Sequence, residues 1–185
     1  MLQKVEGRIT KIIDIEYISW REMRRQKEQF LALTTNAHEE IILVAGELNP
    51  SFYEDGLPEI IKNKLENNKD FSVKILFSKE GSSEIDADKA AKIISVQNPE
   101  ICRVFRAFPQ HIELYWAKRR PKYHFCIFDW DTLLMEAVHK PKMDRDVAIF
   151  LKNPNKVEEY KGYFYKMINS DIVQRINVDQ LVCNA

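Results

Sequence analysis

Two short apolar runs on either side of an amphipathic segment constrain the fold of this chain most strongly. The runs lie within EEIILVAGELNP (39–50) and DFSVKILFS (70–78). Both are too short for a core helix, and continuous apolar runs bounded by turn residues are typical of strands buried on both faces. The intervening LPEIIKNKLENN (57–68) has the pattern of an amphipathic helix. This strand–helix–strand order predicts a parallel pair of strands with a right-handed crossover.

The block YHFCIFDWDTLLMEAVHK (123–140) predicts a hairpin late in the chain. Asp129 and Asp131 supply turn-forming side chains between its two apolar runs. A further strand is predicted at 145–152, and Pro154 introduces a last helix that includes 158–173. Early alternation of strands and helices followed by an antiparallel hairpin predicts an α/β fold. Its mixed β-sheet would be flanked by helices on both faces.

The remaining stretches are less distinctive. Ser19 and Glu22 have the Ser-x-x-Glu spacing of a capping box, which predicts a helix from Ser19 to about residue 38. Other expected elements are a short strand or irregular segment at 5–18, a helix at about 84–96 and a strand at 101–108. The pattern at 110–122 does not decide between helix and strand, although Pro121 would end any helix there.

Composition indicates one globular domain over residues 1–185. Lys plus Arg and Asp plus Glu number 28 each, so the net charge is zero. A dedicated nucleic-acid-binding protein usually carries a basic excess, but a neutral total still permits a local basic strip. The three cysteines have no CxxC spacing, and the sequence has neither an N-terminal apolar segment nor a transmembrane run. These features favour a cytoplasmic protein without disulfides or membrane insertion.

With these elements in place, the chain resembles a single phospholipase D-like domain. The resemblance is strongest over 19–170, which leaves 1–18 as an N-terminal extension. IILVAGELNPSF (41–52) is similar to the family's first core strand and the following loop. The late hairpin followed by RDVAIFLKNPNKVEEYKGYF (145–164) is similar to its closing strand and helix.

The family signature, H-x-K-x4-D followed by G-S-x-N, is only partly present. His124 and Asp131 occupy the histidine and aspartate positions, whereas Cys126 replaces the lysine. His139 and Pro141 replace the serine and the asparagine. An acidic residue that often begins the closing strand would fall near position 145 or 146.

These departures bear on catalysis. The resemblance implies that the histidine attacks phosphorus, that a second histidine protonates the leaving group, and that the lysine and asparagine stabilise developing charge. Cys126 carries no positive charge, and Pro141 has no amide group to donate. Loss of one such donor typically lowers turnover about 100- to 1,000-fold. We therefore expect a catalytically degenerate binding or regulatory module; the alternative is a phosphodiesterase or nuclease with His124 as nucleophile.

Several candidate site residues follow. Residual catalytic roles would fall to His124, Asp131 and His139. Ligand-binding candidates are Glu47, Cys126 and the basic cluster Lys118, Arg119, Arg120 and Lys122. The basic cluster is either a solvated loop or a source of phosphate attraction beside the pocket.

Cys126 has three interpretations. A small buried hydrophobic residue is favoured, while a zinc ligand among nearby His and Asp residues, or a thiol nucleophile activated by His124 or His139, are the alternatives. No metal site and no cofactor are predicted. The expected ligand is a phosphate-bearing molecule or nucleic acid. Because a single motif resembles half of a paired active site, the family resemblance also implies a homodimer with the two His124 residues facing each other.

Overall fold

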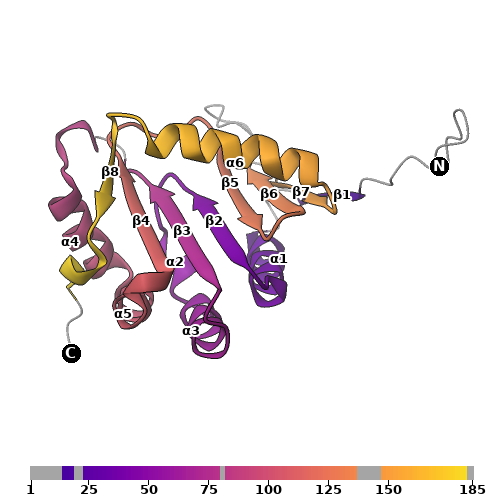
Figure 1. The fold of residues 1–185 in the computed structure, drawn as a ribbon, viewed down its shortest axis with the longest axis horizontal. Coiled ribbons are helices and arrows are strands. Elements are labelled where there is room, and N and C mark those ends of the chain that lie inside the picture. The colour runs from indigo at the N-terminus through magenta and orange to yellow at the C-terminus, as the bar shows by residue number, and fades with distance from the viewer. Residues whose placement is uncertain (1–13, 19–22, 80–81, 137–146, 183–185) are drawn as a thin grey trace, which may run out of the picture.

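The computed structural model describes residues 14–18, 23–79, 82–136 and 147–182. Its strands form one eight-stranded sheet in the order β1-β7-β6-β5-β2-β3-β4-β8 (Figure 1). The strands are β1 (Asp14–Ile18), β2 (Glu40–Val44), β3 (Ser72–Phe77), β4 (Ile112–Ala117), β5 (His124–Phe128), β6 (Thr132–Glu136), β7 (Val147–Leu151) and β8 (Val173–Ile176). The helices are α1 (Met23–Asn36), α2 (Pro50–Tyr53), α3 (Leu57–Asn67), α4 (Ala87–Gln97), α5 (Pro99–Ala107) and α6 (Pro154–Ile168).

The sheet is mixed, as predicted. Strands β2, β3 and β4 run parallel at its centre, and the β2–α3–β3 unit is the expected crossover. The β5–β6 hairpin and β7 extend one side through antiparallel pairs, and β1 continues that side. Antiparallel β8 closes the other side. The short 14–18 strand is thus one of the two possibilities expected for the 5–18 stretch.

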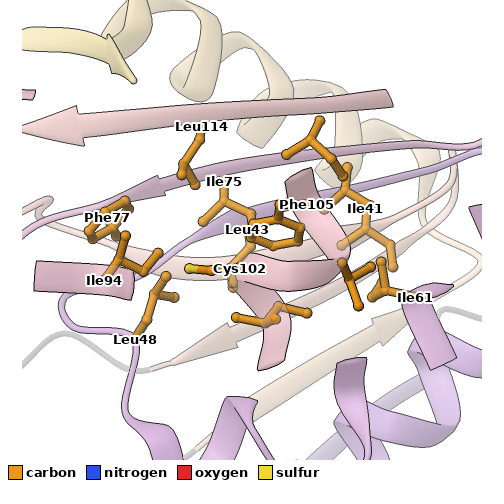
Figure 2. Packing of buried hydrophobic residues seen from close by; sticks show 14 of the residues in the cluster. Ile41, Leu43, Leu48, Ile61, Ile75, Phe77, Ile94, Cys102, Phe105 and Leu114 are labelled. Atoms are coloured by element: carbon orange, nitrogen blue, oxygen red, sulfur yellow. The ribbon is translucent and has the colours of Figure 1, made fainter. Parts of the chain in front are cut away.

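Helices cover both faces of the sheet, which confirms the predicted α/β architecture. In Figure 1, α6 lies across one face, and α1, α3, α4 and α5 lie on the other. Alternate residues of β2 divide between the two layers: Ile41 and Leu43 face the larger cluster beneath α3 and α5, while Ile42 and Val44 face the cluster under α6. Figure 2 shows the larger cluster, where side chains from β2, β3 and β4 meet those of α4 and α5. None of the helices within the described ranges is long and apolar enough to cross a bilayer.

The strand predicted at 101–108 is wrong, because this stretch forms α5. Its alternating pattern also fits a helix, since the buried Ile101, Cys102, Val104 and Phe105 occupy one helical face. Pro99 lies in the first turn, where its missing N–H costs no helical hydrogen bond. The undecided 110–122 stretch contains β4, and β8 follows the last helix, where no strand was expected.

The hairpin turn is tied to the connection between α1 and β2. Asp129 has a positive φ of 57°, and its carboxylate accepts hydrogen bonds from three consecutive backbone N–H groups. The donors are His38 at 2.8 Å, Glu39 at 2.7 Å and Glu40 at 3.1 Å. The carboxylate therefore fixes the start of β2 against the end of β5, and with it the relative position of the two strands that carry the candidate site.

Candidate functional site

A pocket of about 400 Å³ lies beyond the carboxyl end of β2. Its walls come from α1, the segment from Gly46 to Tyr53, the β5–β6 hairpin and the connection before β5. The side chains and backbone that line it include Gln26, Phe30, Gly46, Glu47, Phe52, Tyr53, Arg120, His124, Cys126 and Glu136. Four of the sequence-derived candidates, Glu47, Arg120, His124 and Cys126, line this pocket, which combines apolar and charged groups.

His124 is held in the pocket wall by Glu136. The antiparallel register of β5 and β6 places the two residues opposite each other, and His124 Nδ1 lies 2.9 Å from Glu136 Oε2. Because an ionised carboxylate only accepts hydrogen bonds, Nδ1 is the donor in this pair. His124 is 8% exposed. Glu136 therefore fixes both the orientation of the ring and the nitrogen that carries its proton.

Sequence reasoning missed Glu136 as the partner of the histidine. The acidic residue was sought near positions 145 and 146, which lie outside the described residues. A signal was nevertheless present in the sequence. A hairpin with its turn centred on Trp130 pairs Phe128 with Thr132, and the same register pairs His124 with Glu136.

The backbone at Gly46 lies directly against two of the candidate side chains. A methyl group placed on its Cα would lie 2.7 Å from His124 Cε1 and 3.0 Å from both Nε and Nη2 of Arg120. The Gly46 carbonyl accepts hydrogen bonds from the backbone N–H of Ser78 at 2.9 Å and its hydroxyl at 3.2 Å, which anchors this strand end. Glycine therefore allows the imidazole and the guanidinium to converge on one point of the backbone.

Arg120 is the one member of the predicted basic cluster that lines this pocket. Arg119 is exposed, and the Lys122 ammonium lies 5.2 Å from the ring centroid of Tyr123. The backbone N–H of Lys118 is bonded to the Ile172 carbonyl, which extends the pairing of β4 with β8. Although the four basic residues are close in sequence, Arg120 alone of them thus lines the pocket.

Cys126 is a core residue that also forms part of the pocket floor. It is 1% exposed and lies between Leu43 and Leu134 in the sheet register. Burial raises the pKa of its thiol well above the ordinary value, which disfavours the thiolate needed for nucleophilic attack or metal binding. Within the described part of the chain, no group of three His, Cys, Asp or Glu side chains could hold a metal ion. These observations favour the small hydrophobic interpretation.

We expect Cys126 to resist alkylation in the folded protein, because its thiol is buried and protonated. The measurement is the rate of iodoacetamide labelling followed by mass spectrometry in a Cys183→Ser variant, with and without denaturant. Labelling of Cys126 should require unfolding. Rapid labelling of native protein that disappears in Cys126→Ala would instead indicate an accessible, activated thiol.

Asp131, a predicted catalytic candidate together with His124, does not line this pocket. It follows β5, whereas His124 begins that strand, so roughly 13 Å of strand separates the two ends. Its side chain accepts a hydrogen bond from the Thr132 hydroxyl at 2.9 Å, and its carbonyl accepts one from the Asn153 N–H at 2.7 Å. These are turn-forming contacts. Glu47 does line the pocket, and His139 lies outside the described residues.

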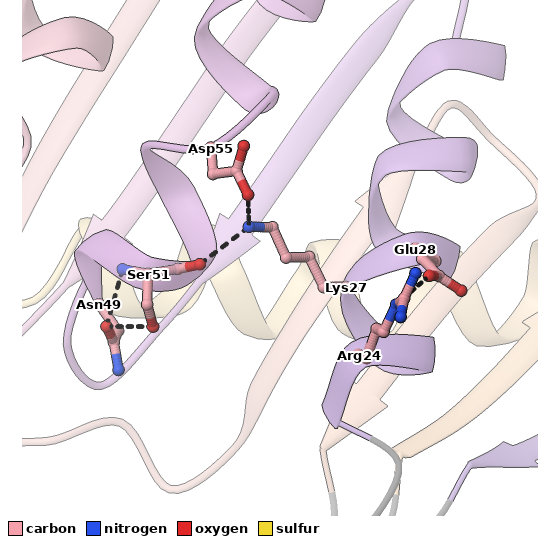
Figure 3. Close-up of polar contacts among 6 residues, drawn as sticks. All are labelled: Arg24, Lys27, Glu28, Asn49, Ser51 and Asp55. Atoms are coloured by element: carbon pink, nitrogen blue, oxygen red, sulfur yellow. Dashed lines mark hydrogen bonds and ion pairs between the residues drawn. The ribbon is translucent and has the colours of Figure 1, made fainter.

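An aromatic wall of the pocket comes from α2 and is attached to α1. Lys27 Nζ donates to the Ser51 carbonyl at 2.9 Å and lies 2.7 Å from an oxygen of Asp55 (Figure 3). This hydrogen bond and the positive charge lower the pKa of the Asp55 carboxyl. At the start of α2, Asn49 Oδ1 accepts the Ser51 N–H and acts as its cap. The anchored helix presents Phe52 and Tyr53 to Phe30 of α1.

The central parallel strands, the antiparallel β5–β6 hairpin and the closing β7–α6 unit define a phospholipase D-like fold. The chain is similar to the phospholipase D family member Nuc from Salmonella typhimurium, with a TM-score of 0.55 and 12% identity, over 90% of this chain and 98% of that one. It is also similar to phosphatidylserine synthase from Haemophilus influenzae Rd KW20, with a TM-score of 0.62 and 16% identity, over 92% of this chain and 39% of that one.

A third similar structure is the archaeal chromatin protein TrmBL2, with a TM-score of 0.55 and 12% identity, over 88% of this chain and 54% of that one. This chain thus spans about half of TrmBL2 and less than half of the synthase. No protein-family model and no curated protein matches the sequence. At identities of 12–16%, these similarities establish the fold alone. The same fold occurs in a synthase and in a chromatin protein, so it does not define the function of this chain, which depends on the pocket.

Proposed function

We propose that this protein is a binding module whose pocket holds the phosphate group of a ligand without cleaving it. The observation that carries the proposal is the convergence of Arg120 and His124 on Gly46. A guanidinium presents several N–H donors in a fork that matches phosphate oxygens. Arg120 comes from the connection before β5, so it supplies the positive charge that Cys126 cannot supply from the strand itself.

Three features favour binding over cleavage. His124 Nε2, the nitrogen that would attack phosphorus, is shielded from solvent. Cys126 is buried and uncharged at the position where the family has lysine. Among the described residues of one chain, His124 is the one histidine that lines the pocket, so a single chain does not supply the second histidine that family-type cleavage would use. TrmBL2, whose structure is described as showing a mode of DNA binding, is a precedent for binding on this fold.

A phosphodiesterase or nuclease that uses His124 as nucleophile is the second candidate. The pair of His124 and Glu136 favours it, because a carboxylate that accepts the Nδ1–H hydrogen bond leaves the lone pair on the opposite nitrogen, the atom that would attack. Hydrolysis of bis(4-nitrophenyl) phosphate separates the two functions. The binding proposal requires no cleavage above the background rate. Cleavage that disappears in His124→Ala would establish the enzyme instead.

Substitution of Arg120 tests the phosphate site. We expect Arg120→Gln to weaken binding of inorganic phosphate by about 10- to 150-fold, because a hydrogen bond to a charged group contributes about 1.5–3 kcal/mol. The matched control is Arg119→Gln, which removes the same charge from an exposed neighbour outside the pocket. Isothermal titration calorimetry at fixed ionic strength measures both. Equal losses of phosphate affinity in the two variants would indicate general electrostatic attraction rather than a specific binding site.

The predicted homodimer remains part of this proposal. A twofold pairing that brings two His124 residues together would place two phosphate sites in one cleft, and twofold dimers are the commonest soluble homo-oligomers. Sedimentation equilibrium gives the oligomeric state directly. A monomer at the highest accessible concentration would contradict the dimer while leaving the phosphate site of the single chain in place.

A further inference from the structure

We infer that the ligand is a small molecule with one phosphate and an aromatic body, of the nucleoside monophosphate class. This inference rests on the proposed phosphate site. The alternative macromolecular ligand is a nucleic-acid strand. Three properties of the pocket distinguish the two: the charges that line it, the aromatic wall on α1 and α2, and its size.

The charged lining suits a single phosphate. Among the described residues, the Asp, Glu, Lys and Arg side chains that line the pocket are Arg120, Glu47 and Glu136. A strand would bring further phosphates next to the first, and each needs its own positive charge to bind well. Here a second phosphate would meet Glu47 at the rim. Lys27, a cation on α1, is already engaged with Ser51 and Asp55 (Figure 3).

The aromatic wall suits the other end of such a ligand. Phe52 and Tyr53 line the pocket from α2, and their rings lie 5.2 Å and 6.0 Å from that of Phe30, centroid to centroid. Aromatic side chains bind nucleobases through their flat faces, which makes such contacts tolerant of base identity. The wall therefore provides an apolar surface within the same pocket as His124 and Arg120.

Polar groups that line the pocket can contact a sugar. Among the described residues, no hydrogen-bond partner is found for the Tyr53 hydroxyl, whose pKa is raised by burial and by the neighbouring Cys126 and Glu136. The hydroxyl therefore stays protonated and can donate. Exposed Glu47 can accept from ligand hydroxyls. A volume of about 400 Å³ lies near the lower end of small-molecule pockets, which are about 300–1,000 Å³.

Four probes test the inference by calorimetry on the full chain: inorganic phosphate, ribose 5-phosphate, adenosine 5′-monophosphate and a decamer of thymidylate. We expect the nucleotide to bind roughly 5- to 150-fold more tightly than ribose 5-phosphate, the range that base–aromatic stacking provides. The decamer should bind no more tightly than the nucleotide. A nucleotide that binds no better than ribose 5-phosphate, or a decamer that binds best, would overturn the inference while the phosphate site stands.

A pair of aromatic substitutions identifies the wall. Phe52→Leu keeps an apolar side chain but removes the ring face, so nucleotide affinity should fall toward that of ribose 5-phosphate while phosphate affinity is unchanged. Trp130→Leu, at an exposed aromatic residue outside this pocket, is the control and should change neither. Equal nucleotide affinity in wild type and Phe52→Leu would also overturn the inference. Failure of all four probes to bind wild-type protein, inorganic phosphate included, would overturn the proposed function itself.

Discussion

Substitution of Gly46 by alanine is expected to weaken phosphate binding by about 10- to 150-fold, the loss of a hydrogen bond to a charged group. The added methyl group would lie 2.7 Å from His124 Cε1, closer than two non-bonded carbon atoms can approach. The Arg120 guanidinium can move aside because its side chain is long and exposed. The imidazole cannot move as freely, because Glu136 holds its Nδ1 at 2.9 Å. Either displacement disturbs the convergence of Arg120 and His124 on Gly46, on which the proposed phosphate site depends.

Gly162→Ala provides the matched control for this substitution. Gly162 lies within α6, and a methyl group placed there would have no neighbour within 4 Å. Alanine at this helical position should leave phosphate binding unchanged and stabilise the fold by about 0.5–1 kcal/mol. Calorimetric titration and urea denaturation measure the two effects. Wild-type phosphate affinity in Gly46→Ala would show that the contact at Gly46 does not shape the site.

Replacement of Asp129 by alanine is expected to lower the free energy of unfolding by about 3 kcal/mol, because hydrogen bonds to a charged group contribute about 1.5–3 kcal/mol each and are not additive. The variant loses the acceptor of the His38, Glu39 and Glu40 backbone N–H groups. It also places alanine at a φ of 57°, a conformation that alanine adopts at a cost of about 1–2 kcal/mol. Urea denaturation followed by circular dichroism measures the change.

Asp131→Ala is the control for Asp129, because it removes a carboxylate two residues away in the same turn. Its side chain accepts one hydrogen bond, from the adjacent Thr132 hydroxyl. We expect a loss of about 1 kcal/mol or less, the contribution of one ordinary hydrogen bond. If the two variants were equally destabilised, the three backbone contacts of Asp129 would not be the source of its effect.

The central strands and the late hairpin could be predicted from the sequence because their hydrophobic patterns have one interpretation each. Runs such as 41–44 are apolar on both faces, and the two aspartates mark the turn between β5 and β6. The 101–108 stretch could not be assigned in the same way. Its apolar residues fit both the two-residue period of a strand and the 3.6-residue period of a helix. Packing against the sheet decides the outcome, because it buries Ile101 and Phe105 on one helical face.

Only part of the candidate site could be predicted from the sequence. His124 was found from the motif, but its partner Glu136 follows from strand register, which the hairpin sequence does specify. Arg120 could not be distinguished from Arg119 by sequence, because the backbone path of the connection decides which side chain reaches Gly46. Asp131 occupies the motif position of a site residue, yet its location in the turn removes it from the pocket.

A crystal soaked in tungstate, a heavy analogue of phosphate, tests the central claim most directly. The anomalous signal of tungsten locates the anion independently of any assumption about the site. We predict a peak in the pocket within hydrogen-bonding distance of the Arg120 guanidinium, beside Gly46 and His124, that is absent in Arg120→Gln. Tungstate bound only at Lys118, Arg119 or Lys122, with none in the pocket, would contradict the proposed phosphate site.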